Sequence, residues 1–200
     1  MKRLYNSFKR QYLTLYLLLL LSFILSLFFD KAIVSYISSF QENWTNNIMV
    51  FIDYSGSALI IISLSTLLLL FYDKNKISYV WLSFAITSLS VFLLKIFVQR
   101  IRPFEEFGLS TLNFLIKDSY STWNLSFPSF HAAIVFSALP FFKGKLRIYW
   151  FLLAFLISFS RLFFALHYLS DIIAGAVLGF SIGFIMLEIF NLKKRKTWQV

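Results

Sequence analysis

The stretch "SRLFFALHYLSD", residues 160–171, lies inside an apolar region that runs from residue 148 to residue 190. A membrane-spanning helix needs about 20 apolar residues, so one continuous helix over this region would be far too long for a bilayer. The chain must therefore turn near "LFFALH". We expect Arg161 to end one helix and His167 to begin the next, which places both side chains at the same membrane surface.

The composition is that of a membrane protein. Of the 200 residues, 59% are hydrophobic and 14% are charged, whereas soluble domains average about 45–50% apolar and about 25% charged residues. The chain has no cysteine, which excludes disulfides, thiol catalysis and zinc–thiolate sites. Its net charge of +10 is expected to reflect orientation in the bilayer, and no nucleic-acid partner is expected.

Six apolar segments predict an all-α integral membrane bundle of about six transmembrane helices, folded as a single domain over residues 1–200. The segments run roughly over residues 11–29, 55–72, 78–98, 130–142, 148–164 and 168–190. The second segment must borrow residues from upstream to span a bilayer. The fourth is short, so we expect it to lie inside the bundle.

Four groups of lysine and arginine fall on one side of the membrane if the chain has six spans. They are Lys2, Arg3, Lys9 and Arg10; Lys74 and Lys76; Lys143, Lys145 and Arg147; and Lys193, Lys194, Arg195 and Lys196. Short loops rich in lysine and arginine face the cytoplasm. We therefore predict a multi-pass protein of the cell membrane with cytoplasmic termini and an active site on the extracytoplasmic side.

Four further basic residues cluster toward the outer side: Lys95, Arg100, Arg102 and Arg161. A lysine or arginine at mid-membrane costs roughly 2.5–3.5 kcal/mol on insertion scales, and acidic residues nearby are few. An anionic ligand would supply the missing negative charge. Arg100 is expected to contact lipid headgroups instead. The polar connection over residues 99–129 is expected to lie on the same outer side. Loops of this length are often functional.

The groups at this outer edge suit a phosphate. Lys95, Arg102 and Arg161 are fixed positive donors, and the planar fork of arginine matches phosphate oxygens. Ser129 offers a hydroxyl. The helix that begins beside it, at Phe130, offers backbone N–H groups, which form an anion site at a helix start.

The two histidines of the chain, His131 and His167, can divide a displacement reaction between them. His167 and Asp171 are four residues apart and share a helical face. The carboxylate can accept from one imidazole nitrogen and leave the other free to attack, while His131 protonates the leaving group. No cluster has the spacing of a metal site, so neither a metal nor another cofactor is expected. A packing role for both histidines is the alternative interpretation.

The order and spacing of these residues resemble the type-2 phosphatidic acid phosphatase superfamily. Its motifs match here as Lys-x6-Arg-Pro at residues 95–103, Pro-Ser-x-His at 128–131 and Ser-Arg-x5-His-x3-Asp at 160–171. Three motifs in the right order are a specific signal, and the predicted six-span layout extends the resemblance over nearly the whole chain.

The resemblance implies a metal-independent phosphatase that works through a phosphohistidine. It implies His167 as the nucleophile, Asp171 as its orienting carboxylate and His131 as the general acid. The residues implied to hold the phosphate are Lys95, Arg102, Ser129 and Arg161.

Phe130 departs from the family pattern, which usually has glycine between the serine and histidine of the second motif. Glycine permits close backbone approach and positive φ. We expect Phe130 to offer its backbone N–H to the phosphate while its ring turns away from the site toward lipid.

The substrate class follows from the site at the membrane rim: a lipid phosphomonoester or diphosphate whose tail stays in the bilayer. Undecaprenyl diphosphate is favoured for so small a chain, and phosphatidylglycerophosphate, phosphatidic acid and lipid A phosphates also fit. One alternative is a phosphotransferase that passes the phosphate to another lipid. Another is a non-enzymatic protein that transports or binds anionic lipid. The oligomeric state is left open.

Three glycines repeat every fourth residue in the last apolar segment, at Gly175, Gly179 and Gly183. Small residues at this spacing allow membrane helices to approach closely. We therefore expect this stripe to serve helix packing rather than chemistry.

Overall fold

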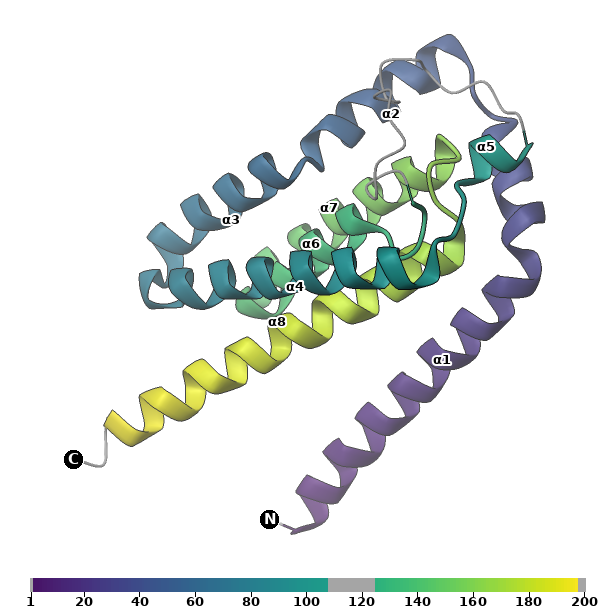
Figure 1. The fold of residues 1–200 in the computed structure, drawn as a ribbon. Coiled ribbons are helices and arrows are strands. Elements are labelled where there is room, and N and C mark those ends of the chain that lie inside the picture. Colours follow the sequence, from purple (N-terminus) through teal and green to yellow (C-terminus); the bar gives the residue numbers. More distant parts are fainter. Residues whose placement is uncertain (1, 108–124, 198–200) are drawn as a thin grey trace.

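The computed structural model describes residues 2–107 and 125–197, and each regular element in these ranges is helical (Figure 1). The longer helices are α1 (Lys2–Ser38), α2 (Asn43–Ser55), α3 (Ala58–Tyr72), α4 (Ile77–Val98), α7 (Gly144–Phe163) and α8 (Leu169–Thr197). The shorter elements are α5 (Pro103–Phe107), α6 (Phe130–Ala138) and the 3-10 turns η1 (Lys74–Lys76) and η4 (Leu139–Phe141). The all-α prediction is confirmed. The predicted connection over 99–129 lies partly outside the described residues, which leave out 108–124.

The spans differ in detail from the predicted six. In the described part of the chain, four helical segments are long and apolar enough to cross a membrane: Leu20–Ser38, Lys74–Glu106, Gly144–Phe163 and Leu169–Lys194. The pair α2 and α3 forms a fifth candidate, bent by 62°. The apolar helix Phe130–Phe141 is shorter than the about 17 residues that a span needs, as expected. By length and composition, the described residues therefore give four or five candidate spans rather than the predicted six.

The short helix α6 lies against α8 along the glycine stripe. A Cβ atom added at Gly179 would lie 1.9 Å from the carbonyl oxygen of Ala133, and one at Gly183 would lie 2.0 Å from that of Ser137. No side chain fits in such a gap, so the two backbones are in direct contact. The predicted packing role of the glycines is confirmed, and the contact fixes where the start of α6 lies relative to α8.

The main apolar core lies between α3, α4, α6, α7 and α8. Its buried members include Ile61, Phe84, Ile134, Ile157 and Leu187, one from each of these helices. Large apolar side chains also cover the outside of the bundle, where Phe71 and Phe97 are 86% and 87% exposed. Such a surface suits lipid rather than water. In a membrane, helices associate by packing and not by withdrawing apolar groups from water, so large apolar side chains can remain on the outside.

The predicted turn at "LFFALH" is present between α7 and α8. The backbone N–H groups of Leu166 and His167 both donate to the carbonyl of Arg161, at 3.0 and 3.3 Å. Ala165 has a φ of 52°, a left-handed conformation that non-glycine residues rarely adopt. The turn folds back on the end of α7, so Arg161 and His167 lie side by side although six positions separate them.

Both chain termini lie at one end of the bundle, and α5 lies at the other (Figure 1). The ends of α4 and α7 and the starts of α6 and α8 meet near α5. The polar residues that these four ends carry therefore gather at the end away from the termini.

Candidate active site

The structure brings the predicted site residues together at this end of the bundle. Lys95 lies in the last turn of α4 and Arg161 in the last turn of α7, while Ser129 is the N-cap of α6. The charged and titratable groups that act electrostatically on the His131 ring are Arg161, His167, Arg102 and Lys95. Three segments far apart in the sequence thus form one cationic site around two histidines.

The ring of His167 is held by a backbone carbonyl. His167 is 2% exposed, and its Nδ1 lies 2.7 Å from the carbonyl oxygen of Ser126. A carbonyl oxygen can only accept a hydrogen bond, so Nδ1 carries the proton and Nε2 keeps its lone pair. This tautomer leaves His167 with one nucleophilic nitrogen.

The predicted direct hydrogen bond from His167 to Asp171 is absent from this geometry. Asp171 Oδ2 lies 3.8 Å from His167 Nδ1, too far for a hydrogen bond. Instead, the Ser126 hydroxyl and the Tyr168 backbone N–H both donate to Asp171 Oδ2. The four-residue spacing does place Asp171 beside the ring, but the carboxylate acts on His167 through Ser126, whose carbonyl faces the imidazole.

His167 lies in the turn outside the spanning segments, and its surroundings favour the neutral ring. Burial, then the charges of Arg102, Lys95 and Arg161, hold the pKa of His167 well below its ordinary value. Burial and neighbouring cations both disfavour a positive imidazolium. The ring is therefore neutral at neutral pH, the state in which it can attack.

Arg161 connects the second histidine to a carboxylate of α2. Its Nη1 donates to Asp53 Oδ1 at 2.5 Å, and its Nη2 lies 2.8 Å from His131 Nδ1. The Ser160 hydroxyl also donates to Asp53 Oδ1, at 3.2 Å. Asp53 therefore fixes the guanidinium in front of His131 from a helix that the sequence did not implicate.

Two donors of the site are buried without a hydrogen-bond partner among the described residues: the Ser129 hydroxyl and the Arg161 Nε. Buried polar groups in proteins almost always have a partner, and each exception requires an explanation. Both residues were predicted from the sequence to bind phosphate. The oxygens of a bound phosphate are acceptors that such donors could bind.

Lys95 and Arg102 are two further cations of the site. Lys95 is 1% exposed, and its ammonium donates to the carbonyl oxygen of Leu125. Arg102 and Arg161 both lie close enough to act on Lys95 electrostatically. In residues 2–107 and 125–197, no group of three or more histidine, aspartate or glutamate side chains gathers to hold a metal ion.

The start of α6 differs from the prediction at Phe130. The residue is half-buried and packs against the main apolar core rather than turning toward lipid. Its ring meets that of His131 edge to face, with centroids 6.1 Å apart. The backbone N–H of Ser129 donates to the carbonyl of Asp171 at 3.0 Å, which ties the starts of α6 and α8 together.

Arg100 holds other residues of the site in place, contrary to the expectation that it contacts lipid headgroups. It donates to Asp171 Oδ1 and Asp30 Oδ2, both at 2.8 Å, and to the Ser170 hydroxyl at 2.6 Å. Its guanidinium also lies over the ring of Tyr168, 3.9 Å from the centroid. Arg100 therefore holds the carboxylate of Asp171 from the side opposite Ser126.

A sequence profile of the PAP2 superfamily matches residues 76–195, more than half of the chain. The chain belongs to the PAP2 superfamily. The structure resembles that of a transmembrane PAP2-type phosphatidylglycerolphosphate phosphatase from Bacillus subtilis, with a TM-score of 0.67 at 24% identity over 88% of this chain and 96% of the other. It also resembles LpxE of Aquifex aeolicus, with a TM-score of 0.64 at 24% identity over 80% and 94%. No curated protein sequence matches significantly.

The PAP2 assignment confirms the family resemblance and the integral membrane fold. All three motifs lie within the matched residues 76–195. Asp30 and Asp53 lie before the match and belong to no motif. Their signal in the sequence was a single carboxylate inside an apolar run, which in a membrane protein indicates a buried polar partner.

Proposed function

We propose that this PAP2 protein is a metal-independent lipid phosphatase that reacts through a phosphohistidine at His167. The observation that carries the proposal is the pair of buried donors without partners, Ser129 Oγ and Arg161 Nε, beside a neutral histidine whose Nδ1 is protonated. Donors that face the position of a phosphate stabilise the charge that develops there during transfer.

The reaction takes two displacements. In the first, His167 Nε2 attacks the phosphorus, the bond to the lipid oxygen breaks, and His131 gives its proton to that oxygen. In the second, His131 takes a proton from water, the water oxygen attacks the phosphorus, and the bond to Nε2 breaks to release phosphate. Arg161, Lys95 and Arg102 balance the negative charge in both steps. The Ser126 carbonyl and Asp171 stabilise the proton that stays on Nδ1.

Undecaprenyl diphosphate is the substrate we favour, because the site lies at the end of an apolar bundle, where the long hydrocarbon tail of such a lipid can stay in the bilayer. A phosphatidylglycerophosphate is the second candidate, supported by the similarity of the fold to that of the Bacillus subtilis phosphatase. The bias of the basic residues supports a site on the extracytoplasmic side, and it agrees with termini at the opposite end of the bundle (Figure 1).

The test is phosphate release by the purified, detergent-solubilised protein. Undecaprenyl diphosphate, phosphatidylglycerophosphate and phosphatidic acid are offered in turn, each with and without a chelator. We expect release from at least one of them, unchanged by the chelator. Release that stops in chelator and returns with magnesium would contradict the metal-independent mechanism.

Two controls separate the alternatives. Mass analysis of the lipid products distinguishes hydrolysis from transfer, because a phosphotransferase yields a second phosphorylated lipid and no inorganic phosphate. Binding of all three lipids without release of phosphate would identify a lipid-binding protein and reject the proposed enzyme.

A further inference from the structure

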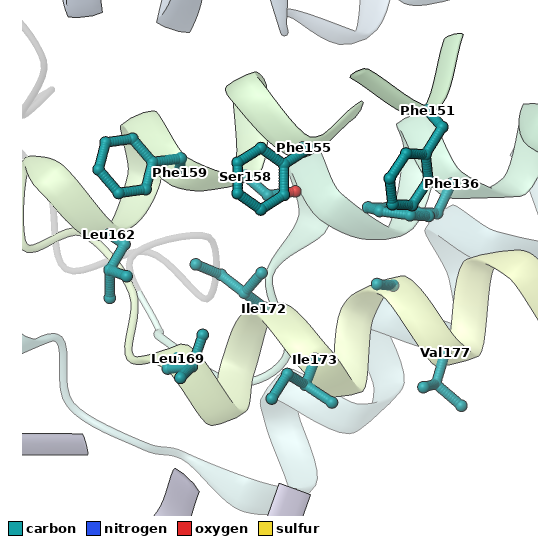
Figure 2. A pocket seen from close by; sticks show the side chains of 11 residues that line it. Phe136, Phe151, Phe155, Ser158, Phe159, Leu162, Leu169, Ile172, Ile173 and Val177 are labelled. Carbon is teal, nitrogen blue, oxygen red and sulfur yellow. The ribbon is translucent and has the colours of Figure 1, made fainter. Parts of the chain in front are cut away.

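The turn between α7 and α8 carries His167, but the two helices that it joins are not in close contact beside it. An apolar groove of about 380 Å³ lies between them, with Phe155 of α7 facing Ile172 of α8 across it (Figure 2). Its lining extends to Leu162 and Leu169, one at each end of the turn. Segments with few buried contacts open easily, so the position of His167 depends on what else the turn contacts.

The segment from Arg100 to Glu106 contacts this turn at several points. The backbone N–H of Phe104 in α5 donates to the carbonyl oxygen of Ala165 at 3.0 Å. The ring of Phe104 packs against the buried apolar side chains of the turn. The guanidinium of Arg100 lies over the ring of Tyr168, and the hydroxyl of the same ring donates to Glu106 Oε2. The turn is therefore held by α5 and by the residues just before it.

The hydrogen bond from Tyr168 to Glu106 is the side-chain contact nearest to the nucleophile in the sequence. Tyr168 directly follows His167 and is 1% exposed, and the hydroxyl of a buried tyrosine usually needs a partner. A carboxylate acceptor makes this a charge-assisted hydrogen bond, which is stronger than a neutral one. The other oxygen of the carboxylate, Oε1, pairs with Lys31 at 2.5 Å. Glu106 thus has one oxygen for each partner.

Glu106 is also tied to a cation of the site. Its backbone N–H donates to the carbonyl oxygen of Arg102 at 3.1 Å. Pro103, which lies between them, has its φ fixed near about −65° by its ring and suits the first position of a helix. Of the cations around the His167 ring, Arg102 has the largest electrostatic effect on it. Glu106 therefore connects the backbone of Arg102 with the residue that follows the nucleophile.

We propose that the hydrogen bond between Tyr168 and Glu106 positions Arg102 beside His167, so that the guanidinium meets the phosphate under attack. The inference rests on the proposed phosphatase function and adds two positioning residues that neither react nor touch the phosphate. Glu106 is exposed, and from the sequence it resembles an ordinary solvated side chain. Its contacts on both sides, with Tyr168 and with the backbone of Arg102, give it this role.

Three substitutions test the hydrogen bond itself. Tyr168→Phe removes the hydroxyl and keeps the ring under Arg100, Glu106→Ala removes the acceptor, and Glu106→Gln keeps an acceptor oxygen without the charge. Tyr149→Phe is the matched control, since it makes the same chemical change at a residue near the start of α7 that is 64% exposed. Lys31→Ala removes the other partner of the carboxylate and leaves the bond to Tyr168.

We expect Tyr168→Phe and Glu106→Ala each to lose about tenfold in kcat/KM on the lipid that is hydrolysed fastest, because a hydrogen bond to a charged group contributes about 10–100-fold. Glu106→Gln should regain most of the loss, and Tyr149→Phe and Lys31→Ala should stay near the unmodified protein. The double variant of Tyr168→Phe with Glu106→Ala should lose no more than either single variant, since both break one bond. Additive losses, or equal losses in Glu106→Gln and Glu106→Ala, would overturn the proposal.

Two further backgrounds separate the positioning of Arg102 from a general loosening of the site. In Arg102→Gln protein the positioned cation is absent, so adding Tyr168→Phe should change kcat/KM by less than about twofold. In Lys95→Gln protein the same addition should still cost about tenfold. A loss of the same size in both backgrounds would show that Tyr168 acts on the fold as a whole, and it would overturn the role assigned to Arg102.

A second measurement does not depend on turnover. Orthovanadate resembles the transferred phosphoryl group, and its binding to the purified protein is measured by isothermal titration calorimetry. Tyr168→Phe should weaken this binding about tenfold, whereas Tyr149→Phe should not change it; equal affinity in the two variants would overturn the proposal. If no lipid releases phosphate but orthovanadate binding still depends on Tyr168, the phosphatase is rejected and the positioning role is kept.

Discussion

The segment that matches the PAP2 superfamily, residues 76–195, carries both histidines and all the cations of the site, whereas α1 and α2 contribute two carboxylates. Asp30 binds Arg100 and Asp53 binds Arg161, each at a buried position. The groups that would touch substrate thus come from one part of the chain, and the groups that hold the arginines in place come from the other. The motifs of a membrane site can therefore contain its reacting groups without containing the residues that position them.

The largest expected effect tests the matched segment. His167→Ala should reduce turnover by at least about 10³-fold, since removal of a catalytic nucleophile leaves only the contributions of binding and charge stabilisation. Rapid quench with ³²P-labelled substrate should trap a phosphorylated protein in the unmodified chain and none in the variant. A variant that still accumulates phosphoprotein would show that a residue other than His167 is the nucleophile.

A smaller effect is expected from Asp53→Asn in α2. The substitution removes the charge that fixes Arg161 beside His131, and a misplacement of about 1 Å at a reacting group costs about 10²-fold. We expect a loss of about 10–100-fold, mostly in kcat, because the arginine is retained but less well oriented. Asp73→Asn is the matched control, since Asp73 also pairs with a cation, Lys76, but at the other end of α4. Equal losses in the two variants would reduce Asp53 to a structural role.

The smallest effect is expected from Asp30→Asn in α1. Asp30 acts on His167 indirectly, through Arg100 and through Ser170 at the start of α8, so we expect a loss of about tenfold or less, about 1.4 kcal/mol at most. Lys31→Ala serves as the control, because its ion pair with Glu106 is exposed and such pairs contribute about 0–1 kcal/mol. If Asp30→Asn proved as inactive as His167→Ala, the division between the two parts of the chain would not hold.

Periodicity and spacing were enough to predict the all-α membrane fold, the turn between α7 and α8 and the packing of the glycine stripe. Each depends on a local rule: bilayer thickness, chain length or the absence of a side chain. The identity of the hydrogen-bond partners did not follow from spacing. A separation of four residues places Asp171 near His167, but only the fold shows that the Ser126 carbonyl, and not the carboxylate, is the hydrogen-bond acceptor of His167 Nδ1.

The partners of Arg100 and Arg161 were missed for a related reason. Asp30 and Asp53 contact the site from helices that precede the motifs by many residues, and such a pairing depends on how the helices cross. An intramembrane carboxylate signals that a partner exists, yet it does not say which of several cations that partner is.

Direct backbone contact between α6 and α8 has a consequence for how tolerant the site is to change. The start of α6, which carries Ser129, is placed on α8 by main-chain contact, so removing a cation of the site should leave the two helices in place. The reverse holds at Gly175, where an added Cβ atom would lie 2.4 Å from the carbonyl oxygen of Ser129. A single methyl group there would push the two helix starts apart and displace Ser129, so we expect Gly175→Ala to lower activity although every side chain of the site is still present.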